Sequence, residues 1–136
     1  MFKTVLLIPF VTVCAAASWG QTATTLSPQQ IDALRAIKVN SEKASAPYAA
    51  KLAVTVKAIY ANMLAAHEDQ KLRKKLARNL HIYTGELLDI RGQSYRDALA
   101  ILTPDQRQTV REALKKPNAP TDIGEVIQTT FGIMDK

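Results

Sequence analysis

A stripe of mainly apolar residues, recurring every three or four positions between residues 72 and 101, most constrains this chain. An α-helix turns 100° per residue, so this spacing keeps the series within an arc roughly 80° wide. The stripe consists of Leu72, Leu76, Leu80, Tyr83, Leu87, Ile90, Ser94, Ala98 and Ile101. It predicts one amphipathic helix from about Gln70 to Leu102, about 50 Å long. Gly85 and Gly92 lie inside it and indicate a bend or a close helix contact.

Two helices are expected before this one. The first begins at Ser27 and runs to about Ala44, with a weak apolar face. Pro47 suits a first helical turn better than a helix interior, so Ser45-Ala46-Pro47 predicts a restart and a second helix to about Ala66. Its expected apolar face comprises Ala49, Leu52, Val56, Ile59, Tyr60 and Met63. His67-Glu68-Asp69 marks the break before the long helix.

One local pattern, L-[ST]-P-x-Q, occurs twice. Its copies are Leu26-Ser27-Pro28-Gln29-Gln30 and Leu102-Thr103-Pro104-Asp105-Gln106. A Ser or Thr N-cap, a proline at the first helical position and a Gln three residues after the cap form a capping box. Each copy therefore predicts a helix start, and the second opens a final helix that ends before Pro117. Residues 121–136 form a tail or a short docking helix.

The first 20 residues differ from the rest. Lys3 precedes an apolar run from Val5 to Ala17, and small residues surround Gly20. This is the layout of a secretory signal peptide (residues 1–20) cleaved near Gly20. A buried N-terminal helix, a membrane anchor and lipidation at Cys14 are the alternatives. The apolar run is short for a membrane span.

Charge and cysteine content limit the partners. The chain has 18 basic and 12 acidic side chains, and its one cysteine, Cys14, lies within the leader. A chain that loses this cysteine cannot form a disulfide, so it is compatible with an oxidising compartment. A moderately basic surface suits acidic partners or anionic lipid. Because export separates the protein from nucleic acid, no nucleic-acid partner is expected.

In an exported helical protein of this size, the paired motifs resemble the periplasmic LTXXQ-motif family, to which Spy and CpxP belong. The resemblance covers roughly residues 24–116, within a domain of residues 21–120. The second copy, with Arg107 after it, matches better, since the first has Ser27 in place of Thr. The motif residues Leu26, Ser27, Gln30, Leu102, Thr103 and Gln106 are expected to cap helices.

This resemblance implies an all-α fold: four main helices in a long, hooked antiparallel hairpin, with room for a short C-terminal helix. It also implies a homodimeric, curved and basic cradle that binds unfolded or partly folded envelope proteins without ATP. The chain lacks the Met- and His-rich N-terminal stretch of better-known members and has an apolar C-terminal segment instead. Both departures leave client range and metal binding open.

A basic cluster at the start of the long helix is the candidate client-binding surface. It consists of Lys71, Arg73, Lys74, Lys75 and Arg78. Four of the five fall in an arc of about 100° opposite the apolar stripe. Such a face can be a solvated helix surface or a patch that attracts acidic client segments or anionic lipid. Arg35, Lys38, Lys51 and Lys57 extend it if the helices pack suitably.

No pattern of catalytic or metal-binding residues stands out. The sequence has no G-x-S-x-G, no glycine-rich phosphate loop and no H-E-x-x-H. His67 and His81 are its histidines, and without a mature cysteine a closed zinc site is not expected. We therefore expect neither an enzyme nor a cofactor.

The resemblance implies a periplasmic, ATP-independent chaperone of the envelope stress response. One alternative is a regulatory adaptor in the same compartment that binds a sensor-kinase domain, or a metal-responsive sensor partner using His67 and His81. Another is a structural helical module whose segment 121–136 docks on a fixed partner.

Overall fold

The structure, a computed structural model, describes residues 25–133. Within that range it holds four helices and no strand, so the expected all-α class is confirmed. These are α1 (Pro28–Met63), α2 (Gln70–Ile101), α3 (Pro104–Leu114) and α4 (Ile123–Phe131). The predicted signal peptide, residues 1–20, lies outside the described residues.

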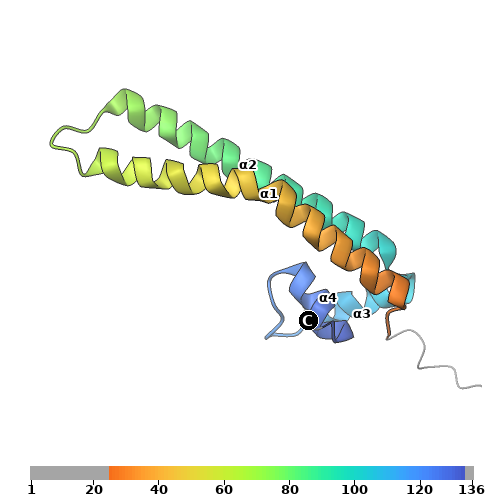
Figure 1. Cartoon of the computed structure of the whole chain (residues 1–136). Coiled ribbons are helices and arrows are strands. Elements are labelled where there is room, and N and C mark those ends of the chain that lie inside the picture. Colours follow the sequence, from red (N-terminus) through yellow and green to blue (C-terminus); the bar gives the residue numbers. More distant parts are fainter. Residues whose placement is uncertain (1–24, 134–136) are drawn as a thin grey trace, which may run out of the picture.

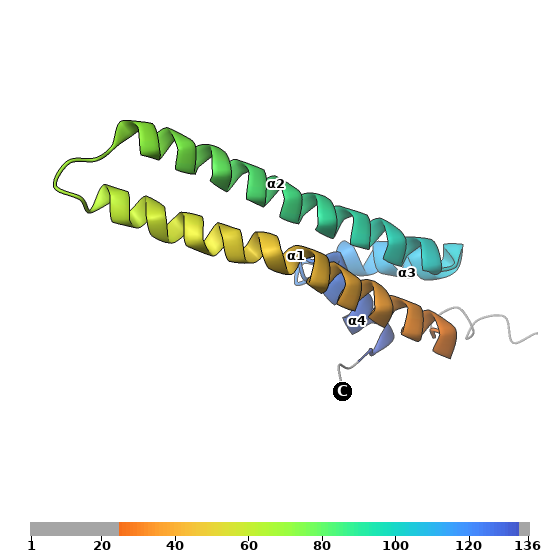
Figure 2. The same cartoon turned by 45° about the horizontal axis from the view of Figure 1, so that its top comes forward.

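The two long helices form an antiparallel hairpin that dominates the molecule. α1 and α2 pack against each other along their length, while the short α3 and α4 lie together beside one end (Figures 1 and 2). We call the end with the loop at residues 64–69 the tip and the end with α3 and α4 the base. At 1.5 Å per residue, the arms are about 50 Å long.

The predicted helix break at Ser45-Ala46-Pro47 was wrong. α1 runs continuously from Pro28 to Met63 with Pro47 inside it. Proline removes one backbone hydrogen bond and crowds the carbonyl four residues earlier, which favours a kink. Pro47 and Lys43 are both exposed, so water can reach the carbonyl that loses its partner. α1 changes direction in its middle section (Figure 1), so packing against α2 holds a bent helix together.

The face that α1 turns to α2 also differs from the expected one. Leu52, Val56 and Ile59 are partly buried, but Ala49, Tyr60 and Met63 are exposed. The fully buried residues of α1 are instead the polar Thr55 and Asn62. Thr55 donates its hydroxyl to the Lys51 carbonyl (2.8 Å), which allows it to be buried.

Asn62 fixes the tip loop. Its amide nitrogen donates to the Asp69 carbonyl, and its amide oxygen accepts from the Asp69 backbone N–H, both at 3.1 Å. The Asp69 carboxylate in turn accepts from the backbone N–H groups of Lys71 and Leu72 and caps α2. These bonds end α1 at Met63, before the expected Ala66, and start α2 at Gln70 as predicted.

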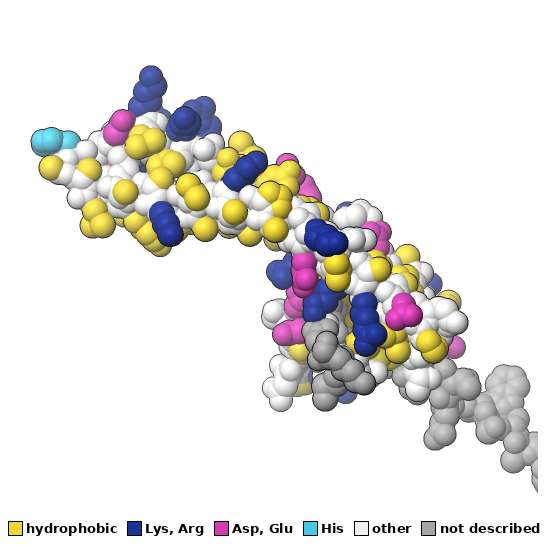
Figure 3. Space-filling view, viewed as in Figure 1, with side chains coloured by type: hydrophobic (Ala, Val, Ile, Leu, Met, Phe, Trp, Pro, Cys, Tyr) yellow, Lys and Arg dark blue, Asp and Glu magenta, His cyan; other side chains and the backbone are white. Residues whose placement is uncertain are grey.

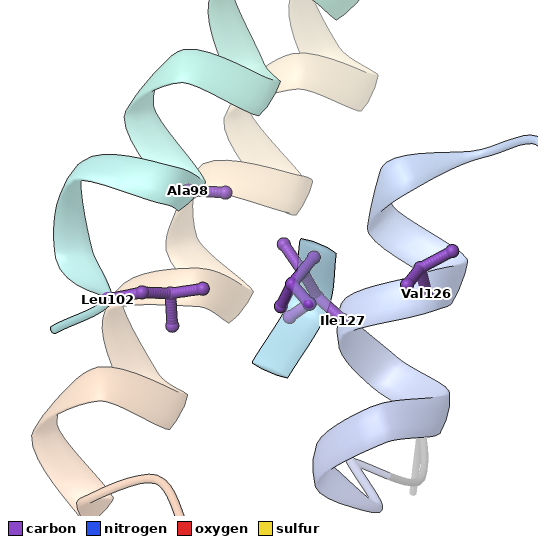
Figure 4. Close-up of a cluster of buried hydrophobic side chains, with 5 residues drawn as sticks. Ala98, Leu102, Val126 and Ile127 are labelled. Carbon is purple, nitrogen blue, oxygen red and sulfur yellow. The ribbon is translucent and has the colours of Figure 1, made fainter. Parts of the chain in front are cut away.

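The base holds the hydrophobic core. Its buried members come from the end of α2, from α3 and from α4: Ala98, Leu102, Val110, Val126 and Ile127. Figure 4 shows Ala98 of α2 and Leu102, which follows α2, pointing toward Ile127 of α4. The described part of residues 121–136 thus forms a short helix that buries its apolar side on this chain.

Candidate functional site

The two L-[ST]-P-x-Q motifs meet at the base. Both form complete capping boxes, with Ser27 and Thr103 as N-caps and Gln30 and Gln106 at the third helical position. Ser27 and Thr103 donate their backbone N–H groups to the Gln30 and Gln106 side-chain oxygens, each at 2.9 Å. The expected helix-capping role of these residues is therefore confirmed.

The structure adds a reciprocal exchange between the motifs. The Gln30 amide nitrogen donates to the Ile101 carbonyl (3.0 Å), and the Gln106 amide nitrogen donates to the Thr25 carbonyl (2.9 Å). Each accepting carbonyl lies two residues before the N-cap of the other motif. The two amides also contact each other, with Gln30 Nε2 to Gln106 Oε1 at 2.8 Å. The motifs thus lock the start of α1 to the α2–α3 corner.

Sequence reasoning missed this exchange, although it contained a signal. A capping box accepts Glu or Gln, because only the side-chain oxygen is needed. An amide can accept at its own cap and donate elsewhere, which a carboxylate cannot do. Gln at both Gln30 and Gln106 therefore indicates a second, donor role. Leu26 and Leu102, which precede the caps, pack into the core at this end.

All five residues of the predicted basic cluster lie at the tip end of α2 and are exposed. Arg73 pairs with Glu68 (Nε to Oε1, 3.8 Å) beside a hollow of about 290 Å³. Figure 3 shows dark blue side chains gathered beside the tip. Lys71, Lys74 and Lys75 lie within the first two turns of α2, so they form a compact positive surface.

The basic residues of α1 that were expected to extend this cluster do not all lie near it. Arg35 and Lys38 lie near the base, where they line a cavity of about 510 Å³ with residues of α2 and α4. Lys51 lies in the middle section of α1, with its Nζ 5.5 Å and 5.8 Å from the ring centres of Tyr48 and Tyr83. Arg35 and Lys38 are therefore not joined to the tip cluster.

Large apolar side chains remain exposed along the hairpin. The described residues of this kind on the hairpin are Val39, Val54, Tyr60, Met63, Leu64, Leu72, Ile82 and Leu88, and Leu114 is exposed at the end of α3. Figure 3 shows yellow side chains over much of the hairpin surface, interspersed with dark blue ones. A two-helix layer has one internal face, so apolar residues on its other faces stay in solvent. The surface is thus both apolar and basic.

A polar clasp holds the start of α4 against α2. The Tyr95 hydroxyl donates to Asp122, the N-cap of α4, and Arg91 Nε lies 3.7 Å from the same carboxylate. Burial and the hydrogen bond to Asp122 raise the pKa of Tyr95 to about 12. Burial alone would raise the pKa of Asp122, but hydrogen bonds from Tyr95 and the Glu125 N–H outweigh it and lower that pKa. Sequence reasoning did not identify this clasp.

Neither histidine lies in a metal-binding arrangement. His67 is exposed in the tip loop and His81 is exposed on α2. Among residues 25–133, no group of three or more histidine, cysteine or acidic side chains is placed to hold a metal ion. None of the four described helices is apolar over a long enough stretch to cross a bilayer.

The arrangement defines a class of protein. It is an all-helical protein with a long hairpin that buries few side chains and with a small core that stabilises one end. Comparisons with family models, curated proteins and solved structures gave no match. The likeness to the LTXXQ-motif family therefore rests on the residues of the two motifs, and membership remains a prediction.

Proposed function

We propose that this protein is a periplasmic, LTXXQ-type chaperone that binds unfolded or misfolded envelope proteins without ATP. The observation that carries the proposal is the hairpin surface, where exposed apolar side chains lie among exposed lysines and arginines. Unfolded chains present both apolar and acidic segments, so a surface of mixed character suits them.

The charge and the apolar groups have different roles in this mechanism. The basic cluster attracts acidic client segments at long range and speeds the encounter. Long Lys and Arg stems then cover apolar client surface, together with exposed residues such as Leu88 and Ile82. Because these contacts are weak and non-directional, the client can fold while bound and then leave.

A homodimer is part of the proposal. One hairpin leaves apolar residues exposed on both arms, among them Val54 on α1 and Leu88 on α2. Contiguous exposed apolar surface is typical of an interaction site. A second hairpin can cover part of it, with the remainder left for clients.

The test is suppression of aggregation of an unfolding model protein by stoichiometric purified chain, without lipid or ATP. We expect suppression that weakens between low and high salt, because screening shortens the range of charge attraction. Replacing Lys71, Lys74, Lys75 and Arg78 with Gln should slow capture several-fold. The matched control replaces Lys43, Arg107, Arg111 and Lys116 with Gln and should retain capture.

Two results would count against this function. Suppression that does not change with salt would remove the electrostatic step. No suppression at any ratio would favour a regulatory adaptor with one fixed partner, such as a sensor-kinase domain.

A further inference from the structure

We propose that the hairpin tip is a docking surface for an anionic phospholipid bilayer. The surface consists of Tyr60, Met63 and the loop from Leu64 to Ala66, together with the basic first turns of α2. This inference concerns a different partner from the proposed clients and does not depend on the chaperone function.

The apolar part of this surface projects from the molecule. Leu64 is 86% exposed, Met63 63% and Tyr60 60%. Ala65 and Ala66 follow and are exposed as well, so the first part of the tip loop, before Glu68 and Asp69, is uncharged. The loop lies at the end of the hairpin opposite α3 and α4, away from the core at the base (Figure 1). A projecting apolar loop suits a soft surface that deforms around it, as lipid does.

The charged part of the surface lies directly behind the loop. Lys71, Lys74 and Lys75 are exposed within about 8 Å of the start of α2, from the rise per residue. The acidic side chains at the tip are already engaged: Glu68 pairs with Arg73, and Asp69 accepts two backbone N–H groups. Five basic and two acidic side chains lie between residues 68 and 78, so this surface has a net charge of +3, which is complementary to anionic head groups.

The order of these groups along the rod favours a bilayer over an acidic protein. When the loop enters the interface, the lysines reach head-group level, because they follow it by one to two turns. Lysine stems can lie along apolar surface while their ammonium groups stay in water. An aromatic ring such as that of Tyr60 suits the same boundary. An acidic protein would use the lysines but would leave Met63 and Leu64 exposed.

The first experiment measures co-sedimentation of the full chain with vesicles. Binding to vesicles of phosphatidylcholine with about a third phosphatidylglycerol is compared with binding to pure phosphatidylcholine vesicles, both at low salt. Each lysine near an anionic membrane surface raises the affinity for that membrane about fivefold. We expect preferential binding to the anionic vesicles. Replacing Lys71, Lys74 and Lys75 with Gln should reduce that preference by on the order of a hundredfold. Every variant carries the same residues 1–24, so their contribution is common to all.

A matched pair of variants tests the apolar loop. The double change Met63→Ser, Leu64→Ser removes apolar groups from the tip, whereas Val39→Ser, Leu114→Ser removes similar groups from exposed sites near the base. Burial of one such side chain changes affinity by about tenfold or more. We expect the tip pair to weaken anionic vesicle binding by at least that factor and the control pair to leave it unchanged.

A depth measurement decides whether the tip itself enters the lipid. Bromine-labelled lipid should quench the added fluorescence of a Leu64→Trp variant and not that of a Leu88→Trp variant. Equal quenching of the two, or equal vesicle binding by the tip and control Ser pairs, would overturn the proposal. So would the absence of any preference for anionic vesicles, including the case where polyglutamate binds the lysine cluster instead. The lipid-free aggregation assay is separate, so either function can fail without the other.

Discussion

The Gln106 side chain accepts a hydrogen bond from one neighbour and donates a hydrogen bond to another, and only an amide can do both. It is 4% exposed, its oxygen accepts the Thr103 N–H, and its nitrogen donates to the Thr25 carbonyl. A carboxylate at this position can still complete the capping box, but its second oxygen places an acceptor against the Thr25 carbonyl and against Gln30 Oε1, both of which accept from Gln106 Nε2. The choice of Gln over Glu is therefore set by contacts between residues 81 positions apart.

We expect Gln106→Glu to lower the free energy of unfolding by roughly 2–3 kcal/mol, because it leaves buried acceptors unpaired beside a buried charge. Urea unfolding followed by circular dichroism measures this. The matched control is Gln29→Glu, an exposed change in the first turn of α1, where a negative charge is favourable. Similar stabilities for the two variants would mean that the exchange between the motifs contributes little.

At the scale of the helix, the sequence identified the two starts that have capping boxes, but it also predicted a start at Pro47 that does not exist. Local side chains make the capping boxes, so Ser27 and Thr103 were identifiable from spacing alone. Continuity through Pro47 depends on packing between α1 and α2, which no local pattern contains. The face of α1 was misplaced for the same reason: Thr55 and Asn62 are polar, and their burial depends on hydrogen bonds that form only after folding.

The docking of α4 should depend on pH at both extremes. The lowered pKa of Asp122 stabilises the docked helix above the ordinary carboxyl range, and this contribution is lost as pH falls below about 4 through the folded pKa. The raised pKa of Tyr95 gives a contribution that is present below pH 10 and is lost as pH rises toward 12.

Ultraviolet absorbance of tyrosinate checks the alkaline side of this prediction. One of the four tyrosines should ionise with a pKa of about 12, and this step should be missing in Tyr95→Phe. Hydrogen exchange of α4 in Asp122→Asn checks the acid side, since this variant should lose the protection that disappears in acid. If no tyrosine ionised with a pKa of about 12, the clasp would not exist in solution.

Over the whole molecule, burial is concentrated at one end. The core cluster and the motif exchange lie at the base, while the tip relies on Leu76, Asn62 and the backbone bonds of Asp69. The sequence predicted the second arm as one helix, and the family resemblance implied a hairpin. Neither predicted this imbalance, because the positions of α3 and α4 relative to the hairpin depend on contacts far apart in the chain. The basic cluster was predictable as a group, whereas its place at the tip followed from the fold.

Amide hydrogen exchange should therefore show a gradient along the hairpin. Amides near Ala98 and Val110 should exchange most slowly and those near residues 60–72 fastest, because local opening costs least where few apolar groups are buried. Mass spectrometry of digested fragments measures this. Protection of the middle of both arms that rises with protein concentration would support the proposed dimer, and uniform protection in a monomer would contradict the gradient.

Because the core and the motif exchange lie in the base, the length of the two arms can change without disturbing either of them. The exchange between Gln30 and Gln106 and the docked α4 are complete within the base, so they do not depend on how far the arms extend. Removing seven residues from each arm in register would shorten the rod by about 10 Å while keeping the facing surfaces aligned. A change of this kind alters the distance between the base and the tip without changing the contacts that hold the base together.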